Sequence, residues 1–315
     1  MNSDSLNSDA LSPDALSPDA LNPDAQHRTS VGPIELQAVE WHVDRRNQAP
    51  SLLMVHATGF HSRVWDQVIH RLPEHHAIAL DQRSHGRSTQ VPITSWAHFG
   101  EDLAGFVKAR DLDSMVGVGH SMGAHALVQA AAREPGRFRA LLLVDPVIAS
   151  PAAYHLPHPA MGSGMHPAAK RRSRFASVQE MIERFATRRP YDLFDAQSLR
   201  DYCTYGLQPA ADGNGLELAC SPLTEASVYM TGRSNATVYA SIRALQIPVW
   251  VVRARQRTPD ADPFDYSYSP TWPELAGEFR LGHDRLIADR SHFLPMEDPA
   301  QVAGLIKALV RSLEG

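Results

Sequence analysis

The chain contains only two cysteines among its 315 residues, Cys203 and Cys220. Two cysteines without a secretory leader do not form the disulfide framework of a small extracellular domain. The first residues also lack the basic stretch and the apolar stretch that make up a signal peptide. No apolar run approaches the length of about 20 residues that a membrane span requires. These absences predict a cytoplasmic protein with no membrane span.

An excess of positive charge is missing as well. The chain has 30 Lys and Arg residues against 35 Asp and Glu residues, which gives a net charge of −5. The five aspartates of the first 25 residues account for about all of this charge, and the remainder is near neutral, so the sequence does not predict a nucleic-acid surface. We therefore expect a small molecule as the partner, and the sequence leaves the oligomeric state open.

The first 25 residues contain neither Lys, Arg nor Glu, but they do contain a five-residue repeat. Residues 6–25 read LNSDA, LSPDA, LSPDA and LNPDA. Prolines at a fixed phase, one acid per repeat and few large apolar groups cannot build a hydrophobic core. We therefore predict that residues 1–30 form a disordered repeat tail.

The remainder of the chain alternates short apolar runs with helical patterns. Hydrophobic residues make up 43% of the sequence, so the chain can bury a large core. Apolar runs that alternate with helices are typical of a parallel sheet covered by helices on both faces. The predicted class is α/β, with a mostly parallel central sheet flanked by helices. The expected strands are 34–43 (in an antiparallel edge hairpin), 52–55, 77–80, 115–118, 140–144, 249–252 and 286–288, and the expected helices are 62–72, 95–110, 122–134 and 299–313.

One long interval interrupts this alternation. About 100 residues separate the strand that ends near Val144 from the strand that starts near Pro248, and so long a connection in a compact domain is usually functional. Within it, residues 177–188, 195–205 and 225–230 look helical. We predict a helical lid over 147–245, inserted into a core formed by 31–146 and 246–315.

The segment that carries most information is Gly119-His120-Ser121-Met122-Gly123. It matches the pattern G-x-S-x-G and lies between an apolar run and a helical pattern. A sharp turn between a strand and a helix holds the serine in a strained conformation, and its neighbours two residues away must lack bulk. The N–H of Met122 then stands at the start of a helix, where it can stabilise an oxyanion.

Four motifs together resemble the α/β-hydrolase superfamily over residues 33–313. They are H-A-T-G-F at 56–60, D-Q-R-S-H-G-R-S at 81–88, G-H-S-M-G at 119–123 and S-H-F-L-P-M-E-D-P at 291–299. The chain looks most like the lid-bearing branch of serine esterases, lipases and C–C bond hydrolases. The resemblance implies Ser121 as nucleophile and His292 as its base, because a serine hydroxyl needs an imidazole to accept its proton. It also implies that the backbone N–H groups of Met122 and Thr58 form the oxyanion hole.

The third member of the triad departs from the family pattern. The family usually places an aspartate after the strand that corresponds to 249–252, but residues 253–257 contain no acid. Asp145 follows the preceding strand, and the resemblance implies that an acid at this position can also reach the histidine. We favour Asp145, and Asp260 and Asp262 in the later loop are the alternative acids.

The resemblance implies a carboxylic ester hydrolase that works through a covalent acyl-enzyme on a small-molecule ester-like substrate. A thioesterase, a lactonase or a C–C bond hydrolase would use the same triad, and a non-catalytic ligand-binding protein could retain it. No cofactor is expected, and no metal site, because the histidines of the lid lack Cys or acidic residues at ligand spacing. The substrate pocket could be lined by five aromatic residues, namely Phe60, Trp65, Tyr154, Tyr202 and Phe293.

Overall fold

The computed structural model describes residues 22–156, 165–258, 261 and 265–314. Within these residues the main sheet has eight strands in the order β1-β2-β4-β3-β5-β6-β10-β11. The strands from β4 to β11 pair in parallel, whereas β1 and β2 form an antiparallel hairpin at one end. The predicted mostly parallel sheet is therefore confirmed. The strands are Ala25–Val31 (β1), Ile34–Trp41 (β2), Ser51–Val55 (β3), Ala77–Leu80 (β4), Met115–His120 (β5), Phe138–Val144 (β6), Val249–Arg253 (β10) and Gly282–Leu286 (β11).

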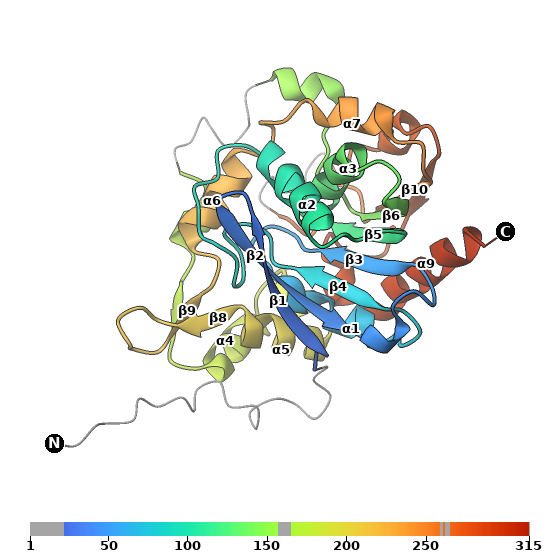
Figure 1. Ribbon diagram of the computed structural model, residues 1–315. Helices are drawn as coiled ribbons and strands as arrows, with labels where there is room; N and C mark the ends of the chain where they lie inside the picture. The colour runs from blue at the N-terminus through green and yellow to red at the C-terminus, as the bar shows by residue number, and fades with distance from the viewer. Residues whose placement is uncertain (1–21, 157–164, 259–260, 262–264, 315) are drawn as a thin grey trace.

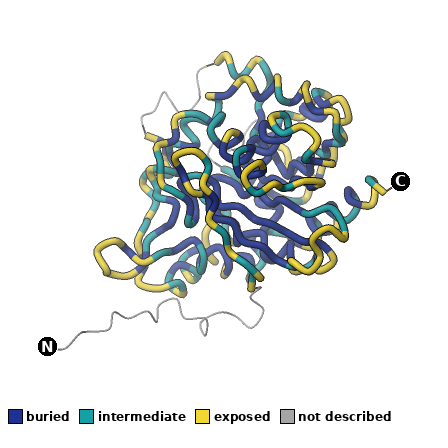
Figure 2. Tube along the Cα trace, in the orientation of Figure 1, coloured by how far each residue is buried: buried dark blue, intermediate teal, exposed yellow. Residues whose placement is uncertain are grey.

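Helices cover both faces of this sheet (Figure 1). The central strands are continuous apolar runs because they are buried on both sides, as the dark blue strands show (Figure 2). In β3, for example, Leu52 and Met54 pack into one core cluster, and Leu53 and Val55 into the other. One cluster includes η4 (Ser62–Trp65), α1 (Asp66–Ile69), α8 (Leu294–Glu297) and α9 (Pro299–Ser312), and the other includes α2 (Ala97–Ala109), α3 (Met122–Arg133) and α7 (Val238–Ala244).

The long connection between β6 and β10 forms a separate group of elements, and we call residues 147–156 and 165–237 the insertion. The three helices predicted here are found in it, but it also contains a three-stranded sheet, β7-β9-β8, which the sequence pattern did not indicate. α7 lies inside the range predicted as lid, yet it packs against α3 on the main sheet. The elements of the insertion are η5 (Pro151–His155), η7 (Pro167–Lys170), β7 (Arg174–Phe175), α4 (Val178–Phe185), η8 (Tyr191–Leu193), α5 (Ala196–Tyr205), β8 (Leu207–Pro209), β9 (Leu216–Leu218) and α6 (Pro222–Met230).

The boundary predicted for the tail at residue 30 is wrong. β1 begins at Ala25, because 25–31 pair antiparallel with β2 through a turn at Gly32, whose φ is 57°. The Asp24 carboxylate also accepts a hydrogen bond from the Val43 N–H at 3.0 Å. The prediction for residues 1–21 lies outside the described residues.

The last strand differs from its predicted position. β11 runs over Gly282–Leu286, whereas the sequence pattern predicts the last strand at the apolar run 286–288. β11 is at the end of the sheet and pairs only with β10, so its polar residues stay exposed and give no apolar signal. Two short helices complete the fold, η3 (Val43–Arg45) and η9 (Leu275–Glu278). In the part of the chain described, every helix is too short or too polar to cross a membrane.

Candidate active site

Ser121 is the single residue between β5, which ends at His120, and α3, which begins at Met122. Its backbone has φ 57° and ψ −116°, a conformation that costs on the order of 1–3 kcal/mol for a residue other than glycine. The flanking glycines allow this turn because their neighbours come very close. A Cβ on Gly119 would lie 2.7 Å from the Ala124 backbone, and one on Gly123 would lie 2.3 Å from the Val55 carbonyl oxygen. Glycine at both positions is therefore required for this turn.

We expect Gly123→Ala to lower the free energy of unfolding by about 1–3 kcal/mol, because the added methyl group would force the backbone of β3 and the turn apart. Urea denaturation followed by circular dichroism measures the change. Gly304→Ala is the matched control, since no neighbouring atom lies within 4 Å of its added Cβ in α9. An equal unfolding midpoint for Gly123→Ala and wild type would contradict the close approach.

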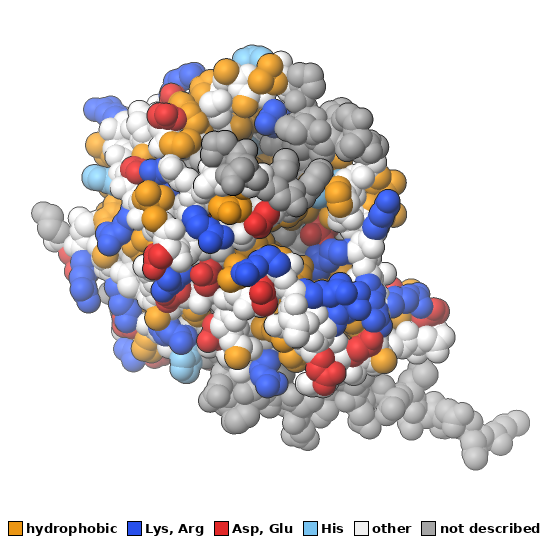
Figure 3. Space-filling model, turned by 180° about the vertical axis from the view of Figure 1, so that it is seen from behind, with side chains coloured by type: hydrophobic (Ala, Val, Ile, Leu, Met, Phe, Trp, Pro, Cys, Tyr) orange, Lys and Arg blue, Asp and Glu red, His pale blue; other side chains and the backbone are white. Residues whose placement is uncertain are grey.

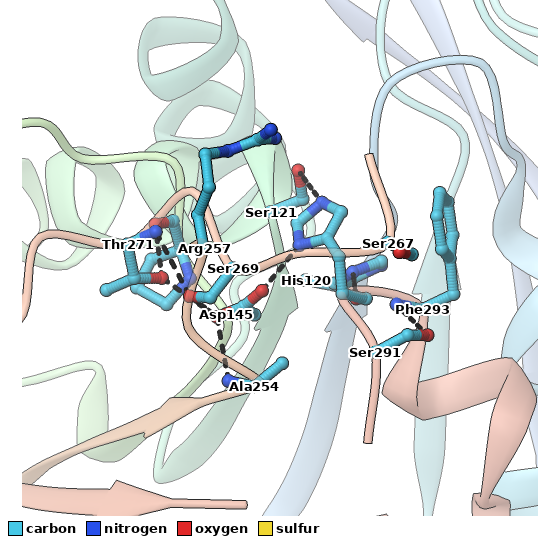
Figure 4. Close-up of polar contacts among 12 residues, drawn as sticks. His120, Ser121, Asp145, Ala254, Arg257, Ser267, Ser269, Thr271, Ser291 and Phe293 are labelled. Atoms are coloured by element: carbon cyan, nitrogen blue, oxygen red, sulfur yellow. Dashed lines mark hydrogen bonds and ion pairs between the residues drawn. The ribbon is translucent and has the colours of Figure 1, made fainter. Parts of the chain in front are cut away.

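Ser121, His292 and Asp145 lie in one hydrogen-bonded series, and Figure 4 labels the serine and the aspartate at its two ends. His292 Nδ1 is 2.6 Å from Asp145 Oδ2, and His292 Nε2 is 3.1 Å from Ser121 Oγ. A carboxylate only accepts, so Nδ1 carries the proton and Nε2 can accept the hydrogen of the serine hydroxyl. The three residues come from the ends of β5 and β6 and from the loop after β11, and all three are buried.

The second oxygen of Asp145 is fully used by neighbouring donors. Oδ1 accepts hydrogen bonds from Ala254 N at 3.0 Å, Ser269 Oγ at 2.5 Å and Thr271 Oγ1 at 3.0 Å. Asp145 itself is completely buried and has φ 46°. These contacts fix the carboxylate so that Oδ2 faces the imidazole.

The alternative acids, Asp260 and Asp262, lie outside the described residues. The neighbouring Asp265 is described, and its carboxylate accepts a hydrogen bond from the Ser267 N–H at 2.8 Å. Two hydroxyl residues of this same loop, Ser269 and Thr271, donate hydrogen bonds to Asp145.

The backbone of His292 is held on two sides. Its N–H donates to the Ser267 carbonyl oxygen at 2.9 Å, and its carbonyl oxygen accepts from His120 Nε2 at 2.7 Å. Burial lowers the pKa of His120 well below its usual value, and the adjacent His292 lowers it further. His120 is therefore neutral and donates from Nε2. His120 is not among the site residues predicted from the sequence, although its place directly before Ser121 is a usable signal.

The side chains of Thr58 and Met122 contact each other, and Met122 directly follows Ser121. Thr58 Oγ1 lies 3.6 Å from Met122 Sδ, and both residues are buried. Met122 is the first residue of α3, so its N–H has no partner within the helix. The loop that carries Thr58 is braced by His56, whose Nδ1 donates to the Ala57 carbonyl oxygen and whose Nε2 accepts from the Gln82 N–H. Burial lowers the pKa of His56 to about 4, which keeps it neutral.

Three of the five predicted aromatic residues lie together next to His292. The ring of Phe60 is 5.0 Å from Tyr202 and 6.1 Å from Phe293, and Phe293 is 5.4 Å from the His292 ring. Trp65 is instead fully buried in the core. Tyr154 packs against Tyr239 of α7, with ring centres 6.0 Å apart.

A polar groove of about 230 Å³ borders the loop that carries His292. The rear face of the molecule is hollowed near its centre, with acidic, basic and hydrophobic side chains around the hollow (Figure 3). The groove is lined by Arg189, Leu193, Arg255, Asp265, Ser267, Asp289, Ser291 and Glu297.

Among the described residues, no group of three or more His, Cys, Asp or Glu side chains could hold a metal ion.

Comparison with known proteins finds sequence similarity to hydrolases over part of the chain. Lipase LipV from Mycobacterium tuberculosis is 33% identical over 114 residues, which cover 35% of this chain and 43% of the lipase. The 2-(acetamidomethylene)succinate hydrolase of Mesorhizobium japonicum is 30% identical over 115 residues, which cover 36% of this chain and 41% of that enzyme. The chain thus aligns with less than half the length of these relatives.

Similarity in three dimensions extends much further along the chain. The crystal structure of E-2-(acetamidomethylene)succinate hydrolase superimposes with a TM-score of 0.69, covering 91% of this chain and 99% of the other at 23% identity. At that identity the likeness concerns the fold alone. The sequence profile of the alpha/beta hydrolase family matches residues 52–305, which is most of the chain. This chain is therefore a member of the alpha/beta hydrolase family.

Proposed function

We propose that this protein is a serine hydrolase that cleaves a carboxylic ester through a covalent acyl-enzyme. The observation that carries the proposal is the buried hydrogen-bonded series from Ser121 Oγ through the His292 imidazole to Asp145. Such a series raises the nucleophilicity of a serine hydroxyl, which is otherwise a poor nucleophile at neutral pH. Names of relatives such as lipase and esterase agree with this chemistry.

In the first half of the reaction, Ser121 Oγ attacks the ester carbonyl carbon while His292 Nε2 takes the hydroxyl proton. The tetrahedral intermediate collapses, the bond to the alcohol oxygen breaks, and His292 returns the proton to that oxygen. In the second half, a water molecule gives a proton to His292 and attacks the acyl carbon. The second tetrahedral intermediate collapses as the bond to Ser121 Oγ breaks, and His292 returns the proton to Oγ. The products are a carboxylic acid and free Ser121. Asp145 holds the imidazole in the required tautomer and stabilises its charge in both halves.

The negative oxygen of each tetrahedral intermediate would accept hydrogen bonds from the N–H groups of Met122 and Thr58. Met122 opens α3, where the N–H has no partner within the helix and the helix dipole favours negative charge. The loss of one such donor typically costs about 100- to 1,000-fold in kcat. The contact between the Thr58 and Met122 side chains supports the proposal that the two N–H groups belong to one site.

The insertion, which lies within the lid range 147–245 predicted from the sequence, would act as a lid that selects the acyl group. Phe60 and Phe293 of the core and Tyr202 of the insertion pack against one another beside His292. An apolar aromatic wall of this kind favours the acyl chain or ring of an ester over a charged group.

A fluorophosphonate probe tests the proposal directly, because it phosphonylates only a serine that is activated for attack. We expect one probe per molecule of wild-type protein, attached to Ser121, with labelling prevented when Ser121 is replaced by alanine. Peptide mass spectrometry locates the modified residue. Wild-type protein that folds but takes up no probe would instead support a ligand-binding protein without catalysis. A panel of esters, thioesters, lactones and vinylogous diketones then identifies the bond that is cleaved.

A further inference from the structure

A buried ion pair within the insertion lies directly against the loop 57–60. Arg171, which follows η7, has its Nη1 2.5 Å from Glu225 Oε2 on α6, and its Nη2 donates to the Tyr202 hydroxyl at 2.8 Å. The side chains of Arg171 and Glu225 are only 19% and 8% exposed. The guanidinium also lies near the rings of Tyr191 and Phe185, 5.7 Å and 5.8 Å from their centres. The pair is therefore shielded from water and held on several sides.

The carboxyl group of Glu225 lies on the side of Gly59, the residue after Thr58, on which a side chain would stand. A Cβ at Gly59 would lie 3.0 Å from Glu225 Cδ and 3.1 Å from its Oε1. Gly59 has φ 79°, in the left-handed region that favours glycine. The carboxyl group of Glu225 thus lies against the position of this loop that has a positive φ.

The space beside the pair is too small for part of a substrate. A cavity lined by Gly59, Phe60, Arg171, Tyr202 and Cys220, among others, has about 10 Å³ available to water-sized groups. That volume is enough for about one water molecule. The ion pair therefore faces the loop and not a pocket that could receive an anionic group.

The start of η7, at the end opposite Arg171, contacts the loop whose hydroxyl groups bind Asp145. His166, which precedes η7, has its Nε2 2.7 Å from the Tyr266 hydroxyl, and its ring stacks on Tyr229 at 4.6 Å. Tyr229 and Glu225 are four residues apart on α6 and so share one face of that helix. Residues of the Tyr266 loop, Ser269 and Thr271, bind Asp145. η7 and α6 therefore connect the neighbourhood of Gly59 with Tyr266, whose loop also carries Ser269 and Thr271.

We propose that Glu225 is a positioning residue that, held by Arg171, fixes the loop 57–60 so that the Thr58 N–H points at the developing oxyanion. This inference rests on the function proposed above. An oxyanion donor must be held within about 0.5 Å of its productive place, and a misplacement of about 1 Å can cost on the order of 100-fold in rate. His56 braces the start of this loop, and Glu225 adds a neighbour from the insertion at Gly59.

Glu225→Ala removes the contact, and Glu225→Gln keeps its shape and a hydrogen-bond acceptor for Arg171. For a p-nitrophenyl ester we expect Glu225→Ala to lower kcat by about 10- to 100-fold, while KM changes little and Glu225→Gln recovers most of kcat. The rate of fluorophosphonate labelling should fall in parallel with kcat. Glu180→Ala is the matched control, because Glu180 pairs with Arg172 at 2.5 Å but on the exposed surface of the insertion. Melting temperatures are measured for every variant, and kinetics are measured well below the lowest of them.

The outcomes separate this inference from the proposed function. Wild-type kcat in folded Glu225→Ala would overturn the positioning role, as would an equal loss in Glu180→Ala. A lower melting temperature with unchanged kcat would also overturn it, since Glu225 would then only stabilise the fold. If wild-type protein neither reacts with the probe nor hydrolyses any ester, the proposed function itself fails.

Discussion

Ser121→Ala is expected to lower kcat/KM for short p-nitrophenyl esters by at least about 10,000-fold, because the group that forms the acyl-enzyme is removed. The residual rate would come from the oxyanion donors and from binding alone. The backbone should keep its shape, since the glycines at 119 and 123 and the hydrogen bond from Ser121 N to the Val144 carbonyl oxygen do not involve the hydroxyl. Release of p-nitrophenol under steady-state conditions measures the effect.

The control for this variant is Ser114→Ala. Ser114 also has a positive φ, 53°, but it lies in the turn before β5 and is exposed. Both substitutions place alanine in the left-handed region, so a loss that is confined to position 121 reports the chemistry and not backbone strain. Retention of wild-type activity in Ser121→Ala would refute the assignment of the nucleophile.

The turn around Ser121 could be predicted because its constraints are local. Ser121 has a glycine two residues away on each side, and it lies between an apolar run and a helical pattern. This arrangement leaves few conformations for the five residues 119–123. The parallel sheet was equally readable, since strands buried on both faces must be apolar along their whole length. β3, β4, β5, β6 and β10 all lie within a few residues of the runs that indicated them.

The features that the sequence did not reveal depend on distant partners or on exposure. β11 is polar because it is an edge strand, and β1 follows a proline-rich repeat whose composition hides the start of the hairpin. The hydroxyl groups that bind Asp145 come from Ser269 and Thr271, more than 120 residues away along the chain. No local pattern distinguishes such a serine or threonine from any other polar loop residue.

The sequence alone does not decide between Asp145 and the later aspartates as the acid of the triad, for a similar reason. Asp145 and the aspartates of the later loop both follow parallel strands, and β6 and β10 are neighbours in the sheet. Acids at both positions could thus reach the same imidazole. The contact of 2.6 Å between Asp145 and His292 favours Asp145 as the residue to test first.

Asp145→Asn is expected to lower kcat by about 10,000-fold, with the fold preserved, because the amide would impose the wrong tautomer on His292. Three donors converge on Asp145 Oδ1, namely Ala254 N, Ser269 Oγ and Thr271 Oγ1. An asparagine would therefore turn its carbonyl oxygen toward these donors and its NH₂ group toward His292 Nδ1. Nδ1 would have to accept that hydrogen bond, which moves the proton to Nε2, so that the imidazole can no longer accept the proton of Ser121.

The matched variants are Asp260→Asn, Asp262→Asn and Asp265→Asn, each measured with the same ester. We expect all three to keep near wild-type kcat. A near-normal Asp145→Asn together with an inactive Asp260→Asn or Asp262→Asn would transfer the role to the later loop. Ser269→Ala and Thr271→Val refine the argument, because each removes one donor from Oδ1 and leaves the carboxylate in place. If the donors act by orienting Asp145, these two variants should lower kcat much less than Asp145→Asn, and their combination should lower it more than either one alone.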